Sequence, residues 1–306
     1  MEKFTKAILD SFAVEKFQNN FKLSNIISCN DKLTKILFCL SADEYFDILQ
    51  NGVSVTVTET VSRGKKIQSH FKLNGGGFAT FKRPFDEYDR AIFDICNSAR
   101  ESGLIGITRD SIFRILTCSE HRSPLPKQAT AILESVKRLM TNIEIDFSQT
   151  RDKITKYSDV PAQIISPILP CRILHNVLVN GKLTSLIQFT NESPLMTIAR
   201  AKKQFITFPV ELRNIANQNN TILVIMLKSY LIRRILEIKL HKQLTPAITF
   251  DDLFNHCLLS NATRWQKQDA RKIVIGVLEN LKSVNIIHNF ELTKKGDSYY
   301  SISITF

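Results

Sequence analysis

The chain has 306 residues, of which 43% are hydrophobic and 23% charged, a composition that suits two or three globular domains. It has no run of 18 apolar residues and its N-terminal segment is charged, so we expect no membrane partner and a cytoplasmic location. The net charge of +12 indicates a polyanionic partner.

Residues 1–84 are predicted to form an N-terminal extension with helices and a β-hairpin. Apolar side chains recur at helical spacing in 4–12 and again in 33–40. Strict alternation in 53–73, on both sides of a short polar turn, predicts two paired strands. The triple glycine at 75–77 lacks the Gly-Lys-Ser/Thr that follows in a phosphate loop, so it is interpreted as a plain turn.

Residues 85–204 begin with a helix whose acidic first turn, 85–90, suits the helix dipole. Thr108 is the expected N-cap of a second helix. A third helix is predicted over 127–140, followed directly by a strand over 143–147. Asn180-Gly181, between apolar alternating runs, is the strongest hairpin signal in the chain.

Residues 205–306 begin with a long apolar helix over 221–241, which the basic pair Arg233-Arg234 interrupts. Thr249 is the expected N-cap of a short helix. A longer helix over 266–284 and a hairpin over 286–306 complete the chain.

These two halves contain an internal repeat. Ile107–Phe113 matches Ile248–Phe254, with Thr as the cap, Asp in the first turn and Phe toward the core. Lys127-Gln128 matches Lys267-Gln268 at nearly the same separation along the chain. We interpret this as one duplicated module, and the alternative is a chance likeness between two unrelated helical bundles.

The repeated order of helix, short helix, longer helix and hairpin is that of a winged helix, in which the third helix lies in the DNA major groove. Arg and Lys bind phosphate or guanine, and Gln can pair with adenine. The candidate contacts of the second copy are Arg264, Trp265, Lys267, Gln268, Arg271, Lys272, Lys294 and Lys295.

Within this set the roles are expected to differ. Arg264, Gln268, Arg271 and Lys272 should face the groove, while Lys294 and Lys295 on the hairpin touch the DNA backbone. Trp265 is interpreted as a buried staple before the helix rather than as a stacking contact. The partner is therefore expected to be double-stranded DNA.

The first copy is weaker as a DNA-binding module. Its candidate contacts are Arg122, Lys127 and Gln128. However, residues 85–150 contain 8 basic and 10 acidic residues, whereas residues 221–306 contain 12 basic and 7 acidic residues. This copy either binds DNA through a local patch or serves as a dimerisation module.

With its basic charge and paired modules, the chain resembles the tandem winged-helix replication initiators of plasmids. The resemblance covers residues 85–306, and Tyr88–Asp94, Ile107–Phe113 and Thr249–Phe306 carry it. It implies binding of origin repeats by the second module, a homodimer through the first, and contacts with the host replication machinery. The expected class is α+β, with an extension at 1–84 and modules at 85–204 and 205–306.

Catalytic motifs are missing from the sequence. The six cysteines form no Cys-x-x-Cys pair and the six histidines no metal-binding spacing, so no metal, no cofactor and no enzyme are expected. Tyr299-Tyr300 is interpreted as strand sequence, because the histidine pair of a rolling-circle nuclease is missing. A transcriptional regulator, or an interaction protein with degenerate winged helices, are the alternatives to an initiator.

Overall fold

The protein has the predicted α+β class. The computed structural model describes residues 23–38, 55–61, 65–74, 85–119, 122–146, 163–179, 181–214, 220–240, 246–296 and 298–306. The helix predicted over 4–12 and the glycine turn at 75–77 lie outside these ranges.

The first part of the described chain is rich in strands. Its elements are β1 (Asn25–Cys29), α3 (Lys32–Leu37), β2 (Val55–Val61), β3 (Lys65–Asn74), α5 (Glu87–Glu101), β4 (Gly106–Thr108), α6 (Arg109–Thr117), α7 (Pro126–Leu139), β5 (Asn142–Asp146), β6 (Gln163–Pro167), β7 (Cys171–Val179) and β8 (Lys182–Phe189).

The second part contains the two longest helices of the described chain, α9 and α11. Its elements are α8 (Pro194–Lys202), β9 (Phe205–Pro209), the 3-10 helix η3 (Val210–Arg213), α9 (Ile222–Leu240), β10 (Ala247–Thr249), α10 (Phe250–His256), α11 (Arg264–Ser283), β11 (Asn289–Lys295) and β12 (Ser298–Thr305).

Two units of the chain share one topology. In the second unit, α9, β10, α10 and α11 lead to the β11–β12 hairpin, and the sheet order is β10-β12-β11. In the first unit, α5, β4, α6 and α7 lead eventually to the β7–β8 hairpin, and the sheet order is β4-β8-β7. In both, the short strand before the second helix pairs with the last strand of the hairpin.

The caps that defined the sequence repeat are present in both units. The Thr108 hydroxyl accepts a hydrogen bond from the Ser111 amide at 3.0 Å, and that of Thr249 accepts one from Asp252 at 3.1 Å. Phe113 is buried in the first unit, as is its counterpart in the second. The duplicated caps and anchors are therefore confirmed at these positions.

The repeat differs from the prediction in the third helix of each unit. Gln128 in α7 and Gln266 in α11 are both the third helical residue, and each accepts a hydrogen bond from the backbone amide of its helix cap. The match of Lys127-Gln128 with Lys267-Gln268 is therefore two residues out of register. Side-chain capping decides the register here, because it places Gln at a fixed distance from the helix start.

The strand predicted after the third helix is present as β5 but belongs to another sheet than β4. β5 does not pair with β4 but lies between β3 and β6 in a four-stranded sheet of order β2-β3-β5-β6. The β7–β8 hairpin lies beside β4, with Gly181 between its strands at a φ of 74°, and Asn180 of the predicted turn lies outside the described residues. In the first unit, β5 and β6 are thus an insertion between the third helix and the hairpin.

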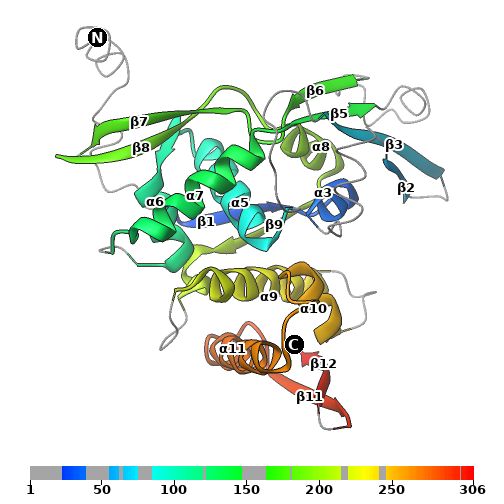
Figure 1. The fold of residues 1–306 in the computed structure, drawn as a ribbon. Coiled ribbons are helices and arrows are strands. Elements are labelled where there is room, and N and C mark those ends of the chain that lie inside the picture. Colours follow the sequence, from blue (N-terminus) through cyan, green and yellow to red (C-terminus); the bar gives the residue numbers. More distant parts are fainter. Residues whose placement is uncertain are drawn as a thin grey trace, which may run out of the picture.

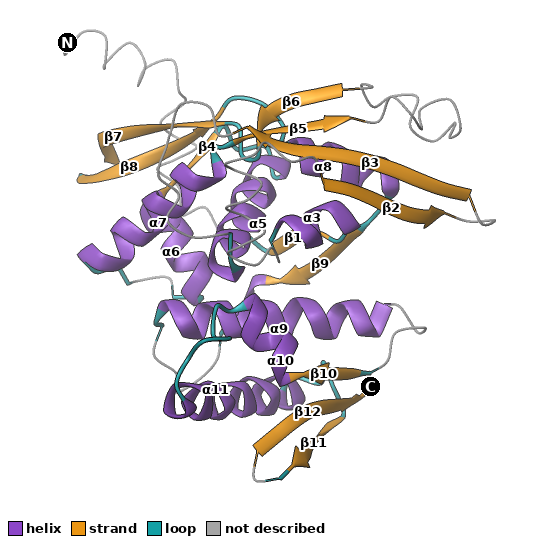
Figure 2. Ribbon diagram, turned by 45° about the vertical axis from the view of Figure 1, so that its right-hand side comes forward, coloured by secondary structure: helices purple, strands orange, loops and turns teal. Residues whose placement is uncertain are grey.

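Strands from before residue 85 are built into the rest of the protein. β3 pairs with β5, and β1 pairs with β9, so pairing crosses both expected boundaries, at 84 and at 204. In Figure 2, β3 lies beside β5, and β1 lies beside β9 among the helices. The N-terminal strands are therefore not a separate hairpin domain within the described chain.

Helix α9, the first helix of the second unit, lies at the junction with the first unit. Its sequence is apolar on nearly every side, and a helix of that kind needs cover all round. Figure 1 shows α5 on one side of α9 and α11 on the other, and both helices pack against it. Leu227, Leu231 and Ile235 are fully buried as a result. Because α11 packs against α9, this helix helps to fix the position of α11, which carries candidate contact residues.

Candidate functional site

The second unit exposes its candidate contacts on the first turns of α11. Thr263 caps this helix, since its hydroxyl accepts a hydrogen bond from the Gln266 amide at 3.3 Å and the Gln266 side chain accepts one from the Thr263 amide at 2.9 Å. This capping box fixes the start of α11. Arg264 follows the cap directly and is exposed.

Three of the predicted contacts share the outward face of α11. Trp265 is 76% exposed, and Gln268 and Lys272 follow it at spacings of three and four residues and are also exposed. The Lys272 ammonium lies 3.2 Å from the Asp269 carboxylate. The face is therefore polar with one large aromatic ring, and its positive charge is partly offset.

Lys267 and Arg271 lie on a different side of α11, toward α10. The Lys267 ammonium donates to the Ser260 carbonyl at 2.7 Å and lies 5.7 Å from the ring centre of Phe254. The Arg271 guanidinium lies 5.2 Å from the same ring and is half-buried. These are cation–π distances. The expectation that Arg271 shares the outward face with Gln268 is therefore wrong.

The prediction of Trp265 as a buried staple is also wrong. Trp265 is the second residue of α11 and its side chain is exposed. Phe250 and Phe254 of α10 are buried, with ring centres 5.8 Å apart, and already supply the aromatic core beside α11.

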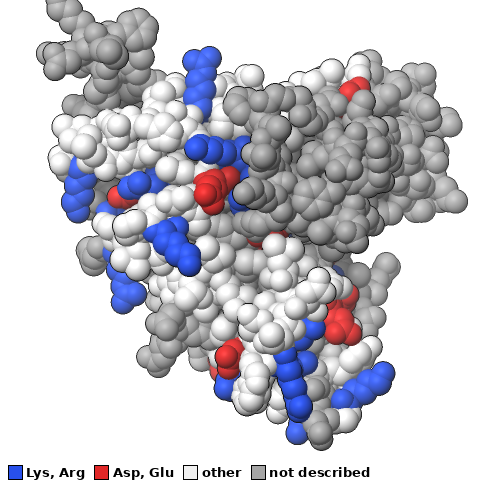
Figure 3. All heavy atoms as spheres, viewed as in Figure 1, with Lys and Arg blue, Asp and Glu red and all other residues white. Residues whose placement is uncertain are grey.

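The β11–β12 hairpin carries the other candidate residues of this unit. Lys294 and Lys295 are exposed near its turn, where Gly296 adopts a φ of 62°, a conformation that favours glycine. Their ammonium groups lie 5.3 Å from the Tyr299 ring and 5.6 Å from the Tyr300 ring, respectively. Figure 3 shows Lys and Arg side chains around α11 and this hairpin.

The candidate residues of the first unit do not form one surface. Arg122 and Lys127 are exposed. The Gln128 side chain is used internally, because it accepts from the Leu125 amide at 2.9 Å and donates to the Asn220 carbonyl at 3.1 Å. Gln128 thus caps α7 and ties it to the residues that precede α9.

The hairpin of the first unit has an apolar tip. Leu178 and Leu183 are cross-strand partners near the tip of the β7–β8 hairpin, and their exposed fractions are 58% and 66%. Sequence reasoning missed this patch, although the two leucines flank the hairpin turn symmetrically. Exposed apolar side chains gathered at one place indicate a contact with another surface more often than do scattered ones.

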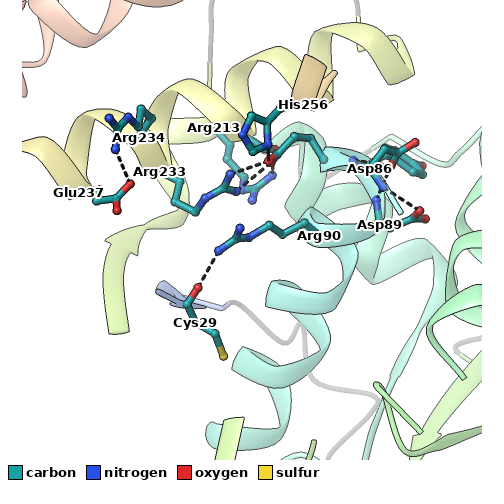
Figure 4. A network of polar contacts seen from close by, with 12 residues as sticks. Cys29, Asp86, Asp89, Arg90, Arg213, Arg233, Arg234, Glu237 and His256 are labelled. Carbon is teal, nitrogen blue, oxygen red and sulfur yellow. Dashed lines mark hydrogen bonds and ion pairs between the residues drawn. The ribbon is translucent and has the colours of Figure 1, made fainter. Parts of the chain in front are cut away.

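A buried ion cluster joins the two units. The Arg233 guanidinium of α9 donates two hydrogen bonds to the Glu87 carboxylate of α5, at 2.8 and 2.5 Å. His256 Nδ1 of α10 lies 3.5 Å from the same carboxylate. Glu87 is fully buried and Arg233 is 7% exposed. Figure 4 shows the side chains of Arg233 and His256 near one another in this cluster.

Electrostatics keep this pair charged. Burial alone would raise the pKa of Glu87. Arg233 and His256 together lower it by more, so the pKa of Glu87 lies well below its ordinary value. Burial lowers the pKa of Arg233, and Glu87 raises it more strongly. Both groups are therefore ionised at neutral pH.

Two further charged groups lie buried beside the pair. Arg90 is 1% exposed and donates to the Cys29 carbonyl of β1 at 2.6 Å. Burial raises the pKa of Asp94 to about 6, although Arg90 and Arg233 lower it. Asp94 consequently titrates close to neutral pH.

The acids expected in the first turn of the helix, Glu87 and Asp89, are present in the first turn of α5, and both are buried. Asp89 pairs with Arg138 and accepts a hydrogen bond from the Ser135 hydroxyl at 2.6 Å. The sequence feature that could have revealed a buried partner for these acids is Arg233, because it lies in an apolar helix and a buried cation is almost always paired.

The described residues contain no group of three or more His, Cys, Asp or Glu side chains that could hold a metal ion. No helix in the same part of the chain is long and apolar enough to cross a membrane. No protein-family model, curated protein or solved structure matches the chain. Function is therefore inferred from the surfaces of α11 and the two hairpins.

Glu87→Gln should lower the free energy of unfolding by about 3–5 kcal/mol, because it leaves Arg233 as a buried cation without its anion. Arg233→Met should have a similar effect, and the double variant should lose less than the two single losses combined. Denaturant unfolding of the full chain measures this coupling. The control is Glu101→Gln, which breaks the partly exposed pair with Arg200 and should cost less than about 1 kcal/mol. Additive losses for Glu87 and Arg233 would contradict the assignment.

Asp94→Asn should change how stability depends on pH. An acid with a raised pKa in the folded state makes that state bind more protons between about pH 4 and pH 6, so its contribution to stability is lost as pH rises through this window. Relative to wild type, the Asn variant should gain roughly 1–3 kcal/mol of unfolding free energy from pH 4 to pH 7. Urea unfolding at several pH values measures the difference. Asp269→Asn, at an exposed position, is the control. Parallel curves for Asp94→Asn and wild type would refute this role.

Proposed function

We propose that the protein binds double-stranded DNA through two winged-helix units, of which the second makes the main contact. The observation that carries this proposal is the topology of the second unit, where α9, β10, α10, α11 and the β11–β12 hairpin follow one another and β10 pairs with β12. In helix-turn-helix proteins the recognition helix lies in the major groove. That helix and the adjoining hairpin carry exposed Lys and Arg side chains, among them Arg264, Lys272, Lys294 and Lys295.

The proposed contacts divide by position on the second unit. Gln268 and Lys272, on the outward face of α11, would reach base edges and nearby phosphates, with Trp265 as an apolar contact beside them. Lys294 and Lys295 would bind the DNA backbone from the hairpin. Lys267 and Arg271 act indirectly in this proposal, since they pack against α10 and hold α11 in place.

The narrower proposal is a plasmid-type replication initiator that works in the cytoplasm and binds repeated sites in an origin. The two units of equal topology and their unequal charge support a division of labour of this kind. A transcriptional regulator would use the same surfaces on an operator. Fragments selected from the host replicon discriminate between them, because an initiator recovers arrays of direct repeats. Contacts with the replication machinery are part of the initiator proposal alone.

A second candidate function is protein binding by the first unit. The apolar hairpin tip at Leu178 and Leu183 favours it, because DNA phosphates offer such side chains no partner. A homodimer through this unit is compatible with DNA binding by the other. If neither unit binds DNA, the protein is an interaction module that binds other proteins. Failure of the wild-type chain to bind duplex DNA at physiological salt would favour that case.

Replacing both hairpin lysines tests the backbone contacts. Lys294→Ala with Lys295→Ala should weaken binding to all duplexes about equally and reduce the log–log salt slope by roughly one to two, since each phosphate contact contributes nearly one unit. Fluorescence anisotropy at several salt concentrations measures the slope. Lys282→Ala, near the other end of α11, is the matched control and should leave the slope unchanged. An unchanged slope in the double variant would remove the hairpin from the interface.

Gln268→Ala tests sequence recognition on the outward face of α11. On a site selected from random duplexes it should cost about 1–3 kcal/mol, because a bidentate contact to a base is lost, and on random duplex it should cost little. Arg271→Lys, which preserves the charge beside the phenylalanines, should retain the preference of the wild type. Equal losses of Gln268→Ala on both duplexes would contradict base recognition by this face.

A further inference from the structure

A pocket of about 360 Å³ lies where helices α3, α5, α9 and α10 meet. Four basic side chains line it: Lys35 from α3, Arg90 from α5, and Arg233 and Arg234 from α9. Its walls therefore come from the N-terminal segment and from both repeated units. Figure 4 shows Arg90, Arg233 and Arg234 in this region.

The acids of the pocket are already engaged. Glu237 pairs with Lys35 and also with Arg234, whose Nη1 lies 2.9 Å from the carboxylate, so one acid serves two cations. Asp252 is at the exposed edge and accepts a hydrogen bond from the Thr249 hydroxyl at 2.7 Å. Four basic and two acidic side chains thus line the pocket, and Arg233 is also paired with Glu87, which is not part of the lining.

Arg90 is the deepest of these cations. Its guanidinium lies 5.7 Å from the Phe38 ring centre, and among the described residues its one hydrogen-bond acceptor is the Cys29 carbonyl. A guanidinium has five N–H donors, and the Arg90 Nε has no partner within the described chain. Burial and the nearby Arg233 lower the pKa of Arg90, while Asp94 and Glu87 raise it. A further anion would offset what remains of this cost.

We propose that this pocket is a binding site for a small phosphate-bearing ligand. The volume is within the range of small-molecule sites. Arg presents planar N–H donors that match phosphate oxygens, and Lys adds a flexible point charge. Cations from three helices surround the space, an arrangement that suits a tetrahedral dianion better than a flat carboxylate.

Such a ligand would tighten the junction between the two units. It would contact α5 of the first unit and α9 of the second at the same time, next to the pair of Glu87 with Arg233. Because a ligand that binds only the folded protein stabilises it, occupancy should raise the unfolding temperature. The site is separate from the outward face of α11, so it does not depend on DNA binding.

The test uses the full chain without DNA, with pyrophosphate as the probe. Calorimetric titration at constant ionic strength, with chloride as the balancing anion, should give saturable binding and a rise in the unfolding temperature. Arg234→Gln and Lys35→Gln, on the more open part of the wall, should each weaken binding about tenfold, which corresponds to the loss of one charge-assisted hydrogen bond. Lys272→Gln, on the outward face of α11, is the matched control and should bind pyrophosphate like the wild type.

Circular dichroism of each variant confirms that it is folded before titration. Absence of saturable binding in the wild type would overturn the proposal. So would equal affinities of wild type, Arg234→Gln and Lys35→Gln, because binding would then lie elsewhere. If Lys272→Gln alone weakens binding, the phosphate is held on the α11 face and the pocket assignment fails, while the DNA-binding proposal is unaffected.

Discussion

The pair of Glu87 with Arg233 is the interaction on which the arrangement of the two units depends. Both side chains are buried, and each would be an uncompensated charge in an apolar interior if the other moved away. Two hydrogen bonds and the nearby His256 satisfy the carboxylate, so the pair is stable only when α5, α9 and α10 are all in place. Moving one unit away from the other would therefore leave a buried charge without its partner.

Helix α9 adds a hydrophobic constraint to this electrostatic one. It is the first helix of the second unit, yet its apolar surface is also covered by α5 of the first. Cutting the chain at 204 would expose that surface to water and would also separate β1 from β9. Each unit thus depends on the other for its core. A structure joined in this way holds α7 and α11 at a fixed separation, which matters for any partner that contacts both.

Local signals in the sequence were sufficient for much of the fold. The caps at Thr108 and Thr249, the long apolar helix and the β7–β8 hairpin follow from short-range physics, and all are present. Strand partners were not predictable, because alternation identifies a strand without saying which other strand it meets. The pairing of β1 with β9 joins segments far apart in the chain. The partner of Glu87 was not predictable for the same reason, since Arg233 lies in a distant helix.

The candidate site was predictable as a set of residues but not as a surface. Helical spacing gives the angle between side chains, and it placed Gln268 with Lys272 correctly, but only the position of α10 decides which side is covered. That position turns Lys267 and Arg271 inward onto Phe254, where they hold α11 rather than extend from it. Lys294 and Lys295 are likewise steadied by tyrosine rings. Side chains held in place before binding lose less conformational entropy when a partner arrives, and this would favour the DNA contact proposed for the second unit.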